Sequence, residues 1–189
     1  MVKYRKAEIK DARHIAELAL YAMKDIVFDF IGEKSESKAI EFLQKLIIEE
    51  KNQYSYKNVT IFEENNDIVG CCIVYDGGKL NELRKPVLEL LKSDYNQNIN
   101  PQDETENGEI YIDCIATYPA HRGKGYGSYI LDYLIEHIAF KENKTLGLLV
   151  DLTNPRAQKL YESKGFIKVG EKQLMSENHY HLQYKKGDS

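Results

Sequence analysis

The sequence predicts one mixed α/β (α+β) domain built around a single sheet. Short β-prone runs alternate with amphipathic helical patterns along the 189 residues. Asn65-Asn66 joins two of the β-prone runs, which is a hairpin signal. A strand, a helix and a second strand follow one another over residues 109–152, which is the order of a parallel crossover unit. Hairpins and a crossover in one chain favour a sheet with both kinds of pairing.

The first elements are strands and two amphipathic helices. Residues 2–9 alternate as a short strand does, and apolar side chains then recur at helical spacing from Ala12 to Ile26, with Asp11 as a candidate cap. A second helix is expected over residues 37–50, with Ser35 or Ser37 as its cap. The two hairpin strands are expected over residues 58–64 and 67–76.

Residues 79–107 differ from their surroundings and predict an insert on the substrate side of the domain. The first half is helical, but Pro86 predicts a break or a new start there. The second half is polar and acidic, which predicts a surface loop. Its carboxylates could attract a cationic amine, although a solvated loop is the simpler interpretation. The acidic residues concerned are Asp94, Asp103, Glu104 and Glu106.

The remaining elements have clear ends. A strand over residues 109–119 stops at Pro119, a helix is expected over 126–140, and a buried-type strand over 145–152. The helix over 154–166 has Asn154 as N-cap and Pro155 at its first position, with Gly165 just past its end. Two final strands are expected over residues 166–175 and 179–186.

Composition excludes several classes of protein. The chain has 26 Lys and Arg against 30 Asp and Glu, a net charge of −4, so nucleic acid is not the expected partner. Cys71, Cys72 and Cys114 form neither a CxxC pair nor a spaced framework, which favours a reducing compartment. No apolar stretch approaches the roughly 20 residues of a membrane span. We therefore expect a soluble, cytoplasmic protein that does not enter a membrane.

The stretch HRGKGYG, residues 121–127, has three alternating glycines at the start of a helix. Helix-start amides lack intrahelical acceptors and favour an anion, and glycines let a phosphate approach the backbone closely. Arg122 and Lys124 add positive charge, so an anion site is favoured over a simple tight turn. A P-loop does not fit because Tyr118 replaces its first glycine, and a dinucleotide fingerprint does not fit because its third glycine is replaced by Ser128.

The pattern that fits is Arg-x-x-Gly-x-Gly, formed by Arg122, Gly125 and Gly127. Together with IYIDCIATYPAHRGKGYGSYIL and the later LLVDLTNPRAQKLYESKGFIKVG, it resembles the GNAT superfamily of N-acetyltransferases over residues 109–170. The resemblance implies one acetyltransferase domain over residues 1–189. It also implies a central, mostly antiparallel sheet with a splayed parallel strand pair and helices on both faces.

The resemblance further implies acetyl-CoA as cosubstrate. The loop amides would bind its pyrophosphate, and the end of the preceding strand would pair with the pantetheine arm, whose two amides suit a free strand edge. Asn154 resembles the family's polar cofactor contact, although it could equally be an ordinary N-cap. The implied cofactor-binding residues are Ile115, Ala116, Thr117, Arg122, Gly123, Lys124, Gly125, Tyr126, Gly127 and Asn154.

Acetyl transfer needs a neutral amine and a proton for the leaving thiolate. Tyr161, on the helix after Asn154, is the candidate acid, with a core aromatic as the alternative. Glu109 and Asp113 share one face of their strand and are the candidate bases. The alternative for Asp113 is a structural carboxylate, and the alternative for Glu109 is a solvated position at the start of the strand. For His179 and His181, which share a face of the last strand, surface or packing roles are favoured over the acceptor site, and a metal site is not expected.

The predicted function is therefore acetyl transfer from acetyl-CoA to a primary amine on a small molecule or peptide. The alternative is an acyl-CoA-binding sensor or interaction module without catalysis. The presence of an acid and candidate bases favours the enzyme. The oligomeric state stays open, a homodimer included.

Overall fold

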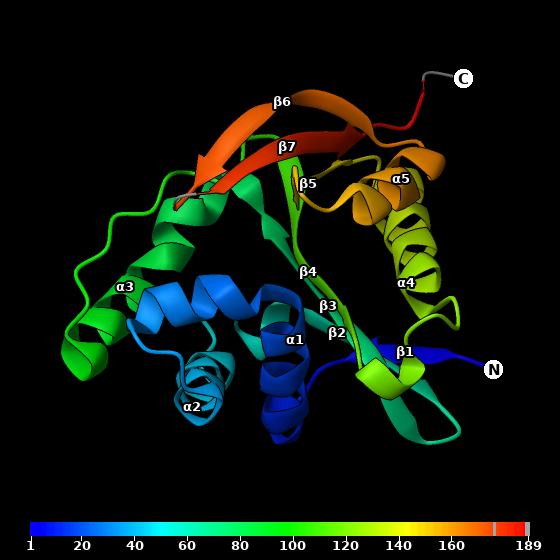
Figure 1. Ribbon diagram of the computed structural model, residues 1–189. Helices are drawn as coiled ribbons and strands as arrows, with labels where there is room; N and C mark the ends of the chain where they lie inside the picture. The colour runs from blue at the N-terminus through cyan, green and yellow to red at the C-terminus, as the bar shows by residue number, and fades with distance from the viewer. Residues whose placement is uncertain (176, 188–189) are drawn as a thin grey trace. The chain divides into compact units, whose positions relative to one another are not determined.

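The computed structural model describes residues 1–175 and 177–187, which contain one seven-stranded sheet in the order β1-β2-β3-β4-β5-β7-β6 (Figure 1). This confirms the predicted mixed α/β fold, with helices flanking the sheet. The strands are β1 Lys3–Lys6, β2 Val59–Glu64, β3 Asp67–Asp76, β4 Glu109–Thr117, β5 Thr145–Asp151, β6 Ile167–Leu174 and β7 Glu177–Tyr184.

Parallel and antiparallel pairing occur together, as predicted. The β1–β2, β2–β3, β5–β7 and β6–β7 pairs are antiparallel. The β4–β5 pair is parallel, and its register covers Glu109–Tyr111 against Thr145–Gly147. This confirms the predicted parallel strand pair.

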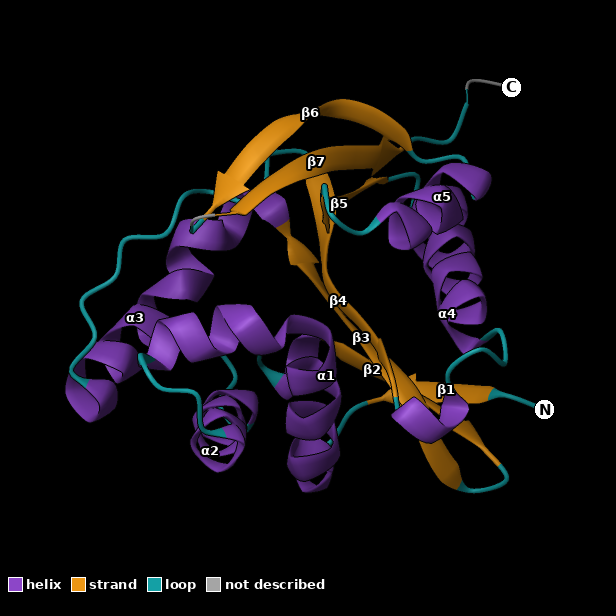
Figure 2. Ribbon diagram, in the orientation of Figure 1, coloured by secondary structure: helices purple, strands orange, loops and turns teal. Residues whose placement is uncertain are grey.

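Five α-helices lie within the described residues (Figure 2): α1 Ala12–Ile31, α2 Glu36–Ile47, α3 Leu80–Tyr95, α4 Tyr126–Leu134 and α5 Pro155–Ser163. Helix α4 continues as a π-helical segment, Ile135–Lys141. Ser35 caps α2 as predicted, by accepting from the Lys38 amide. Asp11 precedes α1 but does not cap it with its side chain, because its carboxylate accepts from Arg5 and the Glu8 amide instead.

The predicted break at Pro86 is wrong, because α3 continues through this residue. A proline inside a helix removes one hydrogen bond and crowds the preceding turn, at a cost of about 3 kcal/mol. Val87 and Leu91 are 1% and 0% exposed. Burial of two such side chains contributes roughly 1.5–3 kcal/mol each, which is enough to offset the proline.

The chain divides into two compact units. The first comprises Met1–Ile73, Asn81–Asn100 and Cys114–Gly127, and the second comprises Val74–Leu80, Pro101–Asp113 and the chain from Ser128 onward. The fully buried side chains of the first unit include Ile15, Leu18, Phe42, Leu43, Ile47, Ile61 and Phe62. Those of the second unit include Ile130, Leu131, Leu134, Leu146 and Leu182. That residues 1–189 form one functional domain, with 79–107 as an insert, stays a prediction.

No helix in the described parts of the chain combines the length and the apolar character that crossing a membrane would require.

Candidate cofactor and active site

The glycine loop has an open surface before α4. Gly123 and Gly125 have φ values of 77° and 87°, a left-handed conformation that favours glycine. A Cβ added at either residue, or at Gly127, would meet no described atom within 4 Å. The loop therefore leaves space for a group to approach the backbone beside the first amides of α4, as an anion site requires.

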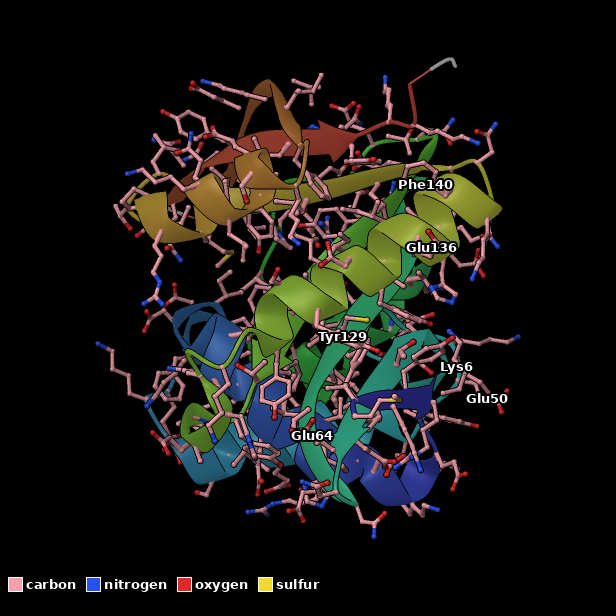
Figure 3. The ribbon with its side chains drawn as sticks, turned by 90° about the vertical axis from the view of Figure 1, so that its right-hand side faces the viewer. Lys6, Glu50, Glu64, Tyr129, Glu136 and Phe140 are labelled. Carbon is pink, nitrogen blue, oxygen red and sulfur yellow. The ribbon has the colours of Figure 1, made fainter. Side chains whose placement is uncertain are left out.

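Glu64, labelled in Figure 3, lies at the end of β2 and fixes the loop. The Tyr126 hydroxyl donates a hydrogen bond to the Glu64 carboxylate. The His121 ring packs edge-on against Tyr126, with centroids 5.7 Å apart. The hydrogen bond lowers the pKa of Glu64 and raises the pKa of Tyr126. The Tyr126 side chain thus connects the loop to the β2–β3 hairpin.

A polar cluster beside the loop was not expected from the sequence. The Tyr118 hydroxyl donates to Glu17 Oε2 at 3.2 Å and lies 2.7 Å from His14 Nδ1. Burial, together with the Glu17 charge, raises the pKa of Tyr118. Tyr21 lies on α1, like His14 and Glu17, and packs its ring edge-on against Tyr118. Local patterns could not reveal this cluster because α1 and Tyr118 are about 100 residues apart.

The exposure of β4 changes along its length. Ile112, Cys114 and Ala116 are buried on one face. Asp113 and Ile115, on the other face, are only half-buried. The Asp113 Oδ2 oxygen itself is inaccessible to solvent. The opposite face of β4 therefore becomes more open towards the end of the strand, beyond the segment paired with β5.

Glu109 occupies a different environment from Asp113. Its side chain is fully buried, and Oε2 accepts from His181 Nε2 at 2.9 Å and from Gln183 Nε2 at 2.7 Å. Its other oxygen accepts from the Glu106 amide at 2.9 Å. The expected alternative for Glu109, a solvated position at the start of the strand, is therefore wrong, because the side chain is buried. Since both oxygens are already engaged, the structure favours a structural role for Glu109 over the role of base.

The electrostatics of Glu109 agree with that assignment. Burial acts to raise the pKa of Glu109, but the hydrogen bonds from His181 and Gln183 outweigh it and hold the pKa below its usual value. A carboxyl whose pKa is lowered on folding stabilises the fold above its unfolded pKa of about 4.3. That stabilisation is lost as the pH falls through the folded pKa.

Glu109→Gln is expected to lower the free energy of unfolding by about 1–2 kcal/mol at pH 7, because hydrogen bonds to a charged acceptor are replaced by weaker ones. Urea denaturation at several pH values measures this. The difference from the wild type should shrink as the pH falls below about 4, where the wild-type carboxyl also becomes neutral. A difference that grows in acid would contradict the ionised, hydrogen-bonded state of Glu109.

The two histidines of β7 are buried, so a surface role is wrong for both. His179 is 8% exposed and His181 1% exposed. His181 lies between Glu109 and Glu106, with Nδ1 3.5 Å from Glu106 Oε1. Lys172 of β6 lies 3.4 Å from the same Glu106 oxygen. His181 therefore has the expected packing role. Its polar contacts with Glu109 and Glu106, and the contact of Lys172 with Glu106, link β4, β6 and β7.

The start of α5 was well predicted. Asn154 Oδ1 accepts a hydrogen bond from the Ala157 amide at 3.1 Å, so Asn154 is the N-cap of α5. This role is compatible with the predicted cofactor contact. Pro155 and Gly165 take their expected places, with Gly165 at φ 96°. Tyr161 is half-buried, and its ring centroid lies 5.9 Å from that of Phe166, which is 2% exposed. Phe166 is thus the core aromatic here, and Tyr161 lies at its margin.

The acidic residues of 94–106 are not all solvated. Asp94 forms an ion pair with Lys45 at 3.1 Å. Glu104 is 5% exposed, and the Tyr75 hydroxyl lies 3.5 Å from it. Thr105 is also buried and donates to the Gly77 carbonyl at 2.6 Å. The expected surface loop is therefore anchored in part, and its charges are partly used within the fold.

Comparison with known proteins assigns the chain to a family. A family model described as the acetyltransferase (GNAT) family matches residues 20–166. The chain belongs to this family. Among solved structures, an N-acetyltransferase from Staphylococcus aureus Mu50 superimposes with a TM-score of 0.80 at 24% identity, over 96% of this chain and 100% of the other. A structure described as an acetyltransferase superimposes with a TM-score of 0.79 at 29% identity, over 97% of this chain and 98% of the other.

A curated relative of this GNAT protein is a mycothiol acetyltransferase from Acidimicrobium ferrooxidans (strain DSM 10331). It is 37% identical over 67 residues. The match covers 35% of the present chain, and the chain spans only 21% of that protein's length. The similarity therefore concerns only a segment of each protein. It does not identify the acetyl acceptor of the present chain.

Proposed function

We propose that this protein is an acetyl-CoA-dependent N-acetyltransferase that acetylates a primary amine. The observation that carries the proposal is the loop at residues 122–127. Two of its glycines have left-handed φ values, and all three have open space where a side chain would stand. A diphosphate would accept hydrogen bonds from the amides at the start of α4.

Each cofactor contact has a physical reason. Arg122 and Lys124 supply positive charge beside the loop amides of Gly123, Gly125, Tyr126 and Gly127. The backbone of Ile115, Ala116 and Thr117 would offer strand hydrogen bonds to the amides of the pantetheine arm, since the register of β4 with β5 covers the earlier residues Glu109–Tyr111. Asn154 is retained as a cofactor contact beside its capping role.

The chemistry is direct attack of the amine on the thioester. Asp113, directly or through water, takes a proton from the ammonium form of the acceptor. The amine nitrogen forms the amide bond as the carbon–sulfur bond breaks, and Tyr161 protonates the departing thiolate. The second proton that the nitrogen loses passes to solvent, and Tyr161 regains its proton from solvent. We keep Asp113 rather than Glu109 as the base, because both Glu109 oxygens already accept hydrogen bonds from protein donors.

The test is release of free thiol from acetyl-CoA in the presence of a panel of amines that includes polyamines, amino acids and peptides. We expect thiol release that depends on one class of amine, with an acetylated product of matching mass. Binding of acetyl-CoA without release across the panel would favour the non-catalytic alternative. The absence of calorimetric binding would refute both.

Gly127→Ala should weaken acetyl-CoA binding about tenfold, because the new methyl group stands where a phosphate approaches the backbone. The substitution should leave the fold intact: the site is open, and alanine is favoured over glycine in a helix by about 1 kcal/mol. Calorimetry and thermal melting measure the two effects. Gly170→Ala, at an equally open site on β6, is the matched control. Unchanged affinity in Gly127→Ala would remove the loop from the cofactor site.

A further inference from the structure

One face of α1 is engaged with the turn that leads into the glycine loop. His14, Glu17 and Tyr21 lie at i, i+3 and i+7 and so share a side of the helix. His14 and Glu17 hold the Tyr118 hydroxyl between them. Glu17 is itself held by Arg13 Nε at 2.5 Å. The Tyr118 side chain is therefore fixed at its polar end.

Tyr118 and Arg122 then meet the same aromatic ring. The Tyr21 ring lies edge-on to Tyr118, with centroids 6.2 Å apart and planes at 72°. The Arg122 guanidinium lies over the Tyr21 ring, 5.9 Å from its centroid. Stacking on an aromatic face restricts a guanidinium that would otherwise sample many rotamers, and it leaves its N–H groups able to donate.

This arrangement exceeds what packing alone requires. The Tyr21 residue remains 50% exposed. The main chain of the turn is already fixed, because the Tyr118 amide donates to Val69 and the Arg122 amide to Pro119. The ring of Tyr21 is thus not needed to shape the loop. What it does contact is the guanidinium of Arg122, the first residue of the loop.

We propose that Tyr21, supported by Tyr118, His14 and Glu17, is a positioning residue that orients Arg122 for phosphate binding. Helix α1 would then contribute to cofactor affinity without touching the cofactor. The inference rests on the proposed function, since it needs a phosphate at residues 122–127. It adds a determinant from α1, outside the glycine motif.

The test is a double-mutant cycle on the affinity for acetyl-CoA, measured by calorimetry at low salt. Tyr21→Leu removes the ring, and Tyr21→Phe keeps it. In the wild-type background, Tyr21→Leu should weaken binding about 2- to 5-fold, the range for an exposed cation–π contact, and Tyr21→Phe should bind like the wild type. In an Arg122→Gln background, Tyr21→Leu should have no further effect, because the group it orients is gone.

Tyr118→Phe should weaken binding in the same direction, since it frees the ring that supports Tyr21. Equal losses from Tyr21→Leu in both backgrounds would overturn the proposal and make Tyr21 a general structural residue. No loss in the wild-type background would overturn it as well. Failure of the wild type to bind acetyl-CoA would instead refute the proposed function, so the two failures are distinguishable.

Discussion

Gly147→Ala is expected to lower the free energy of unfolding by about 3–5 kcal/mol, the range for disrupting a buried charged network. Gly147 lies on β5, opposite Tyr111 in the parallel pair. A Cβ there would lie 2.0 Å from Glu109 Oε2 and 2.2 Å from Glu109 Cδ. The Glu109 carboxylate would have to leave its place, and the donors on His181 and Gln183 would lose their acceptor inside the protein.

Urea denaturation and thermal melting measure the effect, with Gly170→Ala as a control that should be close to neutral. A second genetic background, in which Glu109 is replaced by alanine, separates a clash with Glu109 from an effect on the strand backbone. If the clash with Glu109 is responsible, Gly147→Ala should be far less destabilising once Glu109 is replaced by alanine. An equal loss in both backgrounds would assign the effect to the strand backbone, and no loss would contradict the tight contact between Gly147 and Glu109.

This contact shows where sequence reasoning stops. Alternation along β4 placed Glu109 and Asp113 on one face, and that much follows from the strand period. The strand period could not show that β7 delivers His181 and Gln183 to Glu109. Those partners are 72 and 74 residues away, and the contact depends on the register of β5 with β7. Two carboxylates that look alike in sequence thus differ in environment.

The glycine loop and the cap of α5 were predictable for the opposite reason. Their geometry is set within a few residues, by the left-handed glycines and by Asn154 accepting from the Ala157 amide. The prediction at Pro86 failed because the outcome there was not set locally. A local rule predicted a break, but tertiary burial of Val87 and Leu91 outweighed it. The Tyr118 cluster had no local signal, because it forms between α1 and a distant turn.

Tyr161→Phe is expected to reduce kcat about 10- to 100-fold once an acceptor is known. The substitution removes only the hydroxyl, and the ring can keep its contact with Phe166, so folding and acetyl-CoA affinity should change little. General acid catalysis typically contributes 10²–10⁴-fold. We expect less, because a thiol with a pKa of about 8.5 leaves more readily than an alkoxide and needs its proton less.

The separation of kcat from KM decides between the roles of Tyr161. A proton donor acts mainly in the transition state, so the loss should fall on kcat and leave the KM for acetyl-CoA nearly unchanged. Tyr184→Phe is a matched control, because Tyr184 also packs on Phe166, with centroids 5.5 Å apart, and has no proposed role in catalysis. An unchanged kcat in Tyr161→Phe would make Tyr161 a packing residue, and a rise in KM alone would make it a cofactor contact.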